Sequence, residues 1–242
     1  MGIVATATVN TLIGDEPMRV LHHLEKSRSF RILWAMQELG LDYQVQFYLR
    51  QPNLSAPPEL KAIHPLGKSP ILQDDGLVLV ESAAILEYLQ EKYDRHDFFA
   101  AKAEHSKQQY RFWMHYAEGS LMPLLVMQLV MSNVPRHVPW VIKPVANRIC
   151  DGVKKGFVRP RLKENIEFLE NHLAENEYFA GPFSFADIQM TFPLEAVMTR
   201  TQGRYPQIQA FLQRMQQRPA YRRAKQQEQL LEAQQDRQDD SA

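Results

Sequence analysis

The sequence predicts an α/β domain over residues 18–93 followed by an all-helical domain over residues 101–233. Two patterns lead to this prediction. Strand-like and helix-like periodicities alternate through the first segment, which favours an α/β fold. After a polar linker at 94–100, strand signals nearly vanish and long helical patterns follow. The 242 residues are enough for two small domains that each bury a core.

Local signals place the elements of the first domain. The predicted order is a strand at 19–24, a helix at 28–39, a strand at 43–49, a short helix opening at 57–59, strands at 71–73 and 77–80, and a helix at 82–93. Gly40 would end the first helix as its C-cap, and Asp75-Gly76 between two apolar runs is a strong hairpin signal. A βαβ unit, a helix and a ββα unit in that order form the thioredoxin-like arrangement. A right-handed crossover makes the first two strands parallel.

The remaining segments are predicted as helices or as loosely ordered ends. Helical patterns cover 101–132, 139–175, 184–199 and 206–218. Ser184 followed three residues later by Asp187 has the form of a capping box, so we assign this motif to folding and stability. The polar tail from 219 is expected to begin as a helix and to be disordered over 234–242, and residues 1–17 are expected to form a flexible arm.

Composition excludes several classes of function. Lysine plus arginine and aspartate plus glutamate both number 28, so the net charge is zero and we expect no nucleic-acid partner. The single cysteine, Cys150, cannot form an internal disulfide, which fits a reducing compartment such as the cytoplasm, and we expect it to be buried. The longest apolar stretch, 121–131, is shorter than the roughly 20 residues that span a bilayer, so we expect no membrane partner. The histidines lack metal-ligand spacing, and no metal is expected.

Two polar motifs in the first domain point to a ligand. The helix expected at 82–93 opens on Glu81-Ser82, and Lys68 lies in the loop before the preceding hairpin. Free amides at a helix start, a hydroxyl and a lysine suit a small ligand that carries carboxylates and an amine. Ser27 and Ser29 lie in the polar turn before the first helix, where a bound anion would meet its positive end. The simpler interpretation is that Ser27 and Ser82 are helix caps and Lys68 is solvated.

Together these motifs resemble the glutathione-binding half of the glutathione transferase family, and the resemblance extends over roughly residues 18–221. It implies a serine-type member in which Ser27 contacts the glutathione thiol, with Ser29 as the alternative; Ser27 matches the family position better. The resemblance also implies that the peptide of glutathione is held by Lys68, Ser69, Pro70, Glu81 and Ser82, with Pro70 as the cis-proline of the fold.

The second domain would then be the all-helical glutathione transferase C-terminal domain. At its first helix the resemblance implies a pocket for an apolar second substrate, lined by Tyr110, Met114 and Ala117. Core packing also explains an aromatic- and methionine-rich helix of this kind, and it accounts for most of these residues.

The resemblance implies a cytoplasmic homodimer that conjugates the glutathione thiolate to small apolar electrophiles, a detoxification reaction with glutathione as co-substrate. Lowering the thiol pKa by about two units from about 8.5 takes about 2.7 kcal/mol. A hydroxyl hydrogen bond to a charge, about 1.5–3 kcal/mol, and a helix end, about 0.3–1 kcal/mol, can supply it. The alternatives are a glutathione-dependent peroxidase or reductase on the same fold and a non-catalytic binding module. No cysteine lies in the turn 25–31, which disfavours thiol–disulfide exchange through the protein.

Overall fold

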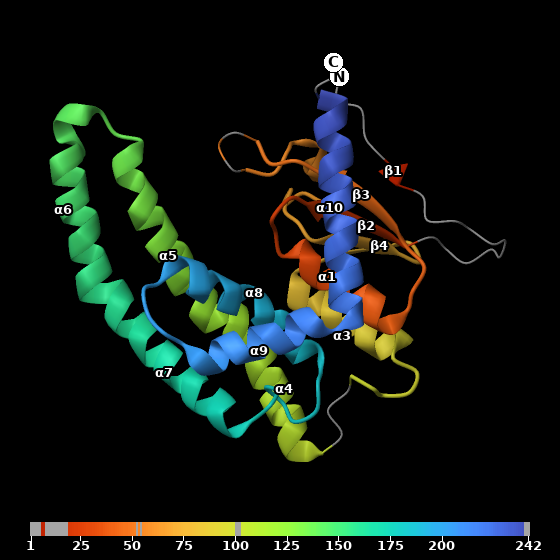
Figure 1. The fold of residues 1–242 in the computed structure, drawn as a ribbon. Helices are drawn as coiled ribbons and strands as arrows, with labels where there is room; N and C mark the ends of the chain where they lie inside the picture. Colours follow the sequence, from red (N-terminus) through yellow and green to blue (C-terminus); the bar gives the residue numbers. More distant parts are fainter. Residues whose placement is uncertain (1–5, 8–18, 52, 54, 100–102, 240–242) are drawn as a thin grey trace. The chain divides into compact units, whose positions relative to one another are not determined.

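The computed structural model describes residues 6–7, 19–51, 53, 55–99 and 103–239. The chain divides into two compact units, one formed by residues 1–98 together with 216–242 and the other by residues 99–215 (Figure 1). The helical domain predicted over 101–233 therefore ends earlier, because the last helix packs with the N-terminal unit.

The first unit is built on a mixed sheet with the strand order β1-β3-β2-β4-β5. Its strands are β1 (Thr6–Ala7), β2 (Val20–Leu24), β3 (Gln44–Tyr48), β4 (Ile71–Asp74) and β5 (Leu77–Val80). β2 and β3 are parallel, as the predicted crossover requires, whereas β4 is antiparallel to both β2 and β5. β1 pairs with β3, so part of the arm predicted over 1–17 joins the sheet. The other residues of that arm lie outside the described part of the chain.

The hairpin between β4 and β5 turns at the predicted Asp75-Gly76 pair. Asp75 has φ 51° and Gly76 has φ 77°. Two consecutive positive φ angles are the signature of a type I′ turn, which matches the twist of the paired strands. Because Ile71 pairs with Val80, the hairpin returns the start of the next helix to the side of the loop that precedes β4.

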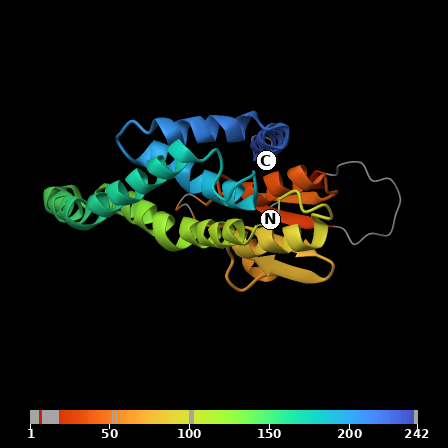
Figure 2. The same cartoon turned by 90° about the horizontal axis from the view of Figure 1, so that it is seen from below.

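Four helices complete this unit: α1 (Ser29–Leu39), α2 (Glu59–Ile63), α3 (Ser82–Tyr93) and α10 (Pro219–Asp239). α1 ends at Gly40, which has φ 64° as a left-handed C-cap, and this confirms the predicted boundary. α1 packs against β2, α3 and α10, and Figures 1 and 2 show α10 running beside it. α1 therefore forms the centre of the unit.

α10 corrects the prediction of a disordered tail over residues 234–239, because the helix continues to Asp239. The last three residues of the predicted tail, 240–242, lie outside the described part of the chain. Beyond Ala220 in the first turn of α10, buried side chains lie three, four and three residues apart, at Tyr221, Ala224, Glu228 and Leu231. The Tyr221 ring packs edge-on against Trp34 of α1, with ring centroids 5.0 Å apart. A helix that buries one stripe against a neighbour is stabilised by that packing, despite its polar composition.

The described residues of the second unit form helices joined by loops and no strand. Its helices are α4 (Glu104–Tyr116), the π-helical turn η1 (Ala117–Leu121), α5 (Met122–Asn133), the 3₁₀ turns η2 (Val134–Arg136) and η3 (Trp140–Ile142), α6 (Lys143–Val153), the π-helical turn η4 (Lys154–Val158), α7 (Arg159–Glu175), α8 (Phe185–Arg200) and α9 (Pro206–Gln217). The predicted capping box is present at the start of α8, where Ser184 and Asp187 bond each other's backbone. Among the described residues, no helix combines the length and apolarity needed to cross a membrane.

Candidate functional site

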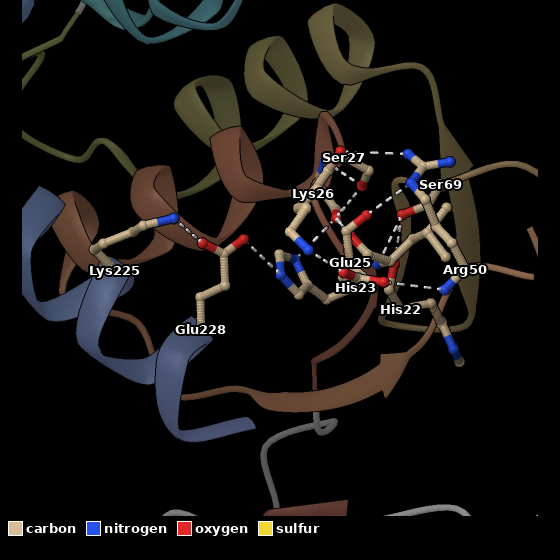
Figure 3. Close-up of polar contacts among 11 residues, drawn as sticks. His22, His23, Glu25, Lys26, Ser27, Arg50, Ser69, Lys225 and Glu228 are labelled. Atoms are coloured by element: carbon tan, nitrogen blue, oxygen red, sulfur yellow. Dashed lines mark hydrogen bonds and ion pairs between the residues drawn. The ribbon is translucent and has the colours of Figure 1, made fainter. Parts of the chain in front are cut away.

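The turn between β2 and α1 is braced from β3. The Glu25 amide donates to the Tyr48 carbonyl at 2.9 Å. Arg50 donates from Nε to the Glu25 carbonyl at 3.0 Å and from Nη2 to the Lys26 carbonyl at 3.3 Å. Glu25 also pairs with Lys26, and this contact lowers the pKa of the Glu25 carboxyl (Figure 3). These bonds hold the backbone that presents Ser27.

Ser27 and Ser29 form a connected pair at the start of α1. The Ser29 amide donates to Ser27 Oγ at 3.2 Å, and the two Oγ atoms are 2.7 Å apart. Ser29 Oγ also accepts the Leu24 N–H at 3.2 Å and lies 2.8 Å from His23 Nδ1. Ser29 is fully buried, whereas Ser27 keeps 5% exposure. The partners of the Ser29 hydroxyl are thus all internal.

The N-terminus of α1 is not neutralised by its own first turn. No acidic residue lies there, and the N-cap residue Arg28 makes no side-chain capping bond. A helix N-terminus of this kind favours a bound anion. Ser27 does accept the first helical amide, so the capping role considered for it is present as well.

The loop before β4 meets the same turn at Leu24. The Ser69–Pro70 peptide is cis, as the sequence resemblance implied. Ser69 Oγ donates to the His22 carbonyl at 3.0 Å and accepts the Leu24 N–H at 3.3 Å. The Leu24 amide is therefore shared between Ser69 and Ser29, while the preceding Lys68 is exposed.

The start of α3 adds a buried cation that sequence reasoning missed. Glu81 is exposed and has φ 68°, a strained geometry that costs a non-glycine residue about 1–3 kcal/mol. The buried Ser82 Oγ accepts a hydrogen bond from Arg31 Nη1 at 2.9 Å, and Arg31 is only 1% exposed. The signal available in the sequence was a single charge inside the apolar run 30–36 of α1.

Ser27, Ser69 and Ser82 are thus linked to one another through α1 and the end of β2. Ser27 and Ser69 are linked through Ser29 and the Leu24 amide, and Ser82 is tied to α1 through Arg31. The arrangement places hydroxyls, a helix N-terminus and a buried guanidinium in one unit. It can bind a ligand that carries anionic groups.

The predicted second-substrate residues lie elsewhere in the chain, in the helical unit. Tyr110, Met114 and Ala117 are all buried there, with 7%, 0% and 0% of their surface exposed. Their role as pocket residues stays a prediction. Cys150 is buried and not disulfide-bonded, as expected from the sequence.

Comparison with known proteins gives consistent matches. Residues 16–91 match the family described as glutathione S-transferase, N-terminal domain, and residues 153–219 match the corresponding C-terminal domain. The chain is 38% identical over 208 residues to glutathione S-transferase 3 of Schizosaccharomyces pombe, covering 85% of this chain and 86% of that protein. It is 31% identical over 227 residues to glutathione S-transferase 1 of Saccharomyces cerevisiae, covering 89% and 97% respectively. A crystal structure of a glutathione S-transferase from Actinobacillus pleuropneumoniae matches with a TM-score of 0.71 and 29% identity, covering 88% of this chain and 93% of that one.

Proposed function

The chain belongs to the glutathione S-transferase family, and we propose that its Ser27 hydroxyl stabilises the thiolate of bound glutathione for transfer to a small apolar electrophile. The chain is a glutathione transferase, for which glutathione is the co-substrate. The observation that carries the proposal is the hydrogen-bonded Ser27–Ser29 pair at the N-terminus of α1.

The surroundings of the two serines favour Ser27 over Ser29. Ser29 Oγ is surrounded by the Leu24 amide, His23 Nδ1 and Ser27 Oγ, and it has no exposed surface. Ser27 Oγ has both of its partners on Ser29 and keeps a small exposed surface. A ligand sulfur could therefore reach Ser27 without displacing an internal hydrogen bond.

The energy required agrees with what this turn can supply. A thiol with a pKa of about 8.5 must be lowered by about two units, or about 2.7 kcal/mol, to be mostly ionised near neutral pH. One charge-assisted hydrogen bond contributes about 1.5–3 kcal/mol and the helix end about 0.3–1 kcal/mol. No acidic residue in the first turn of α1 opposes this effect.

The remaining polar groups suit the peptide part of glutathione. Ser82 Oγ accepts from the buried Arg31, so its own proton is left to donate to the α-carboxylate. The exposed Glu81 carboxylate would take the adjacent amine, and the backbone of Ser69 would pair with the cysteinyl backbone in the manner of an added strand. The exposed Lys68 would meet the glycine carboxylate.

The test is Ser27→Ala, with turnover followed on chlorodinitrobenzene and glutathione affinity measured by calorimetry. If two pKa units are lost, turnover at pH 7 should fall about 25-fold, since a thiol of pKa about 6.5 is about three-quarters ionised there and one of pKa about 8.5 only about 3% ionised. Affinity should change little because the peptide contacts remain. Ser55→Ala, at an exposed serine of the same unit, is the matched control. Unchanged turnover in Ser27→Ala would exclude the assigned role, and binding without turnover in the wild type would favour a binding module.

We further propose that the protein is a homodimer, assembled through the helical unit. Exposed apolar side chains lie on the neighbouring elements α5, α6 and η4, at Val126, Val130, Val145, Ile149 and Phe157. Exposed apolar side chains on neighbouring elements can form an interaction site. Sedimentation analysis should show a dimer that Ile149→Glu dissociates, whereas Leu230→Glu, at an exposed leucine of α10, should leave it intact. A monomeric wild type would exclude this assembly.

A further inference from the structure

A chain of polar contacts runs from Ser27 through the interior to the C-terminal helix (Figure 3). Ser27 Oγ lies 2.7 Å from Ser29 Oγ, which lies 2.8 Å from His23 Nδ1. His23 Nε2 in turn lies 3.2 Å from Glu228 Oε1 of α10. His23 and Ser29 have no exposed surface and Glu228 has 2%. Groups that are this deeply buried keep a defined set of donors and acceptors.

The chemistry of these atoms fixes where the protons must be. An ionised carboxylate can only accept, so His23 Nε2 carries a proton towards Glu228. Ser29 Oγ has one proton and two lone pairs, and one lone pair is occupied by the Leu24 N–H. The direction of the Ser27–Ser29 bond therefore depends on whether the other nitrogen of His23 is protonated.

If His23 Nδ1 is protonated, the Ser27 proton is directed outward. Nδ1–H fills the second lone pair of Ser29, whose own proton then goes to Ser27 Oγ. Ser27 Oγ then accepts two hydrogen bonds, one from the Ser29 hydroxyl and one from the Ser29 N–H. The Ser27 proton has no remaining internal partner and can be donated to a ligand.

If His23 Nδ1 is bare, the Ser27 proton is used internally. Ser29 donates to Nδ1, and the 2.7 Å contact between the two hydroxyls then needs the proton of Ser27. A sulfur anion next to Ser27 would meet a lone pair, which is repulsive. The Leu24 carbonyl is a poorer acceptor for Ser29, at 3.4 Å.

Both ring nitrogens of His23 face groups that can accept a hydrogen bond, Ser29 Oγ at Nδ1 and Glu228 Oε1 at Nε2. The Phe47 ring from β3 lies on one side, with ring centroids 5.6 Å apart, and carries no charge. Glu228 faces Nε2, and Lys225 on the same helix contacts the other oxygen of that carboxylate. Burial acts to raise the pKa of Glu228, but its contacts with His23 and Lys225 outweigh burial and leave that pKa below its usual value.

Three more charged residues lie on the other side of Ser27. Glu25 and Lys26 pair with each other in the turn, and Arg50 binds the backbone of both. This cluster holds one carboxylate and two cations, with Arg28 close enough to act on Arg50, and its carboxylate is paired with Lys26. Glu228 is the carboxylate that contacts His23.

We propose that Glu228 and His23 are positioning residues that direct the Ser27 hydroxyl proton towards the sulfur of bound glutathione. This inference rests on the proposed function, in which Ser27 contacts that sulfur. α10, which lies at the far end of the sequence, then acts on the thiol site through the Glu228–His23 contact, without touching the ligand itself.

The test is the ionisation of enzyme-bound glutathione in Glu228→Gln, followed by the ultraviolet absorbance of the thiolate as pH is varied. Glutamine keeps the size and an oxygen that can accept from His23 Nε2, but it removes the negative charge that faces this nitrogen. The pKa of the bound thiol should rise by about one unit, and turnover at pH 7 should fall about threefold and recover at high pH. Glutathione affinity should not change.

Glu38→Gln is the matched control, because Glu38 of α1 forms an ion pair with Arg218, the residue that immediately precedes α10. Arg218 donates to its two oxygens at 2.6 and 3.0 Å, remote from the serine pair. This variant should lose stability but keep the thiol pKa of the wild type. Equal thiol pKa shifts in the two glutamine variants would overturn the proposal, since the effect would then be structural.

Two further variants complete the test. His23→Gln should raise the thiol pKa as much as Glu228→Gln, and the double variant should add nothing, because both changes break one pathway. Additive shifts would refute a shared pathway. Ser27→Ala, titrated in the same way, separates the positioning role of Glu228 from the role of Ser27. If the thiol pKa rises in Ser27→Ala but does not shift in Glu228→Gln, the positioning role alone is rejected. No shift in Ser27→Ala would reject both.

Discussion

We predict that removing the capping box of α8 lowers the free energy of unfolding, by an amount that follows from the hydrogen bonds lost. Asp187 is fully buried; its Oδ1 accepts the Phe179 N–H at 2.9 Å, and its Oδ2 accepts the Ser184 N–H at 2.8 Å. Asp187→Ala leaves both amides buried without this acceptor. At about 1–3 kcal/mol for each unsatisfied donor, the expected loss is about 2–6 kcal/mol. That is a large part of the roughly 5–15 kcal/mol that keeps a typical domain folded.

Equilibrium denaturation by urea measures this loss. Asp187→Asn should lose less than Asp187→Ala, because the one remaining oxygen can still accept from one of the two amides. Asp151→Asn, at a half-exposed acid of the same unit, is the control and should change stability by no more than about 0.5 kcal/mol. A transition midpoint for Asp187→Ala equal to that of the control would show that the amides find other partners and would refute the reasoning.

Two other predictions concern the N-terminal unit. Arg31→Met removes the buried cation beside Ser82. Calorimetry should then show glutathione binding weakened about tenfold or more, because hydrogen bonds to charged groups contribute about 1.5–3 kcal/mol. Unchanged affinity would exclude Arg31 from the site. Glu228 has a folded pKa below its ordinary value of 4.5, so its stabilising effect is present above pH 4.5 and is lost as pH falls through the lower folded value. The wild type should therefore lose more stability on acidification than Glu228→Gln, and parallel acid profiles in denaturation would contradict this.

The features that could be predicted from the sequence are those whose information is local. The Asp75-Gly76 turn, the Gly40 cap and the capping box from Ser184 each depend on a few consecutive residues. Their backbone geometry follows from which residues tolerate positive φ and which side chains reach a nearby amide. At these positions the structure has the backbone geometry that the local sequence predicts.

α10 was missed over its last turns because its information is not local. The buried residues of α10 recur every three or four positions from Tyr221 on, as in any amphipathic helix, but one of them is Glu228 and another is the small Ala224. A carboxylate in the middle of the buried stripe, among many glutamines and arginines, makes the segment read as a solvated or disordered tail. Its buried partner, His23, lies about two hundred residues earlier, and nothing in the sequence pairs the two.

The adjacent histidines of β2, His22 and His23, have different hydrogen-bonding partners because they lie on opposite faces of the strand. They point to opposite sides, as the alternation of a strand predicts. His22 lies 2.9 Å from the Tyr48 hydroxyl and 2.9 Å from Gln73 Oε1, and burial lowers its pKa. A hydroxyl that donates and an amide oxygen that accepts satisfy a neutral ring completely, so His22 has no use for a second proton.

His23 faces α10 instead, where a carboxylate takes the place of the amide oxygen. The same residue type in the same strand thus faces an amide oxygen on one side of the sheet and a carboxylate on the other. The difference is made by what packs on each face and not by the strand. The proton available at Ser27 is therefore set by the C-terminal helix, which is why a change at Glu228 should alter the chemistry of the thiol while Glu38, on the same interface, should alter stability alone.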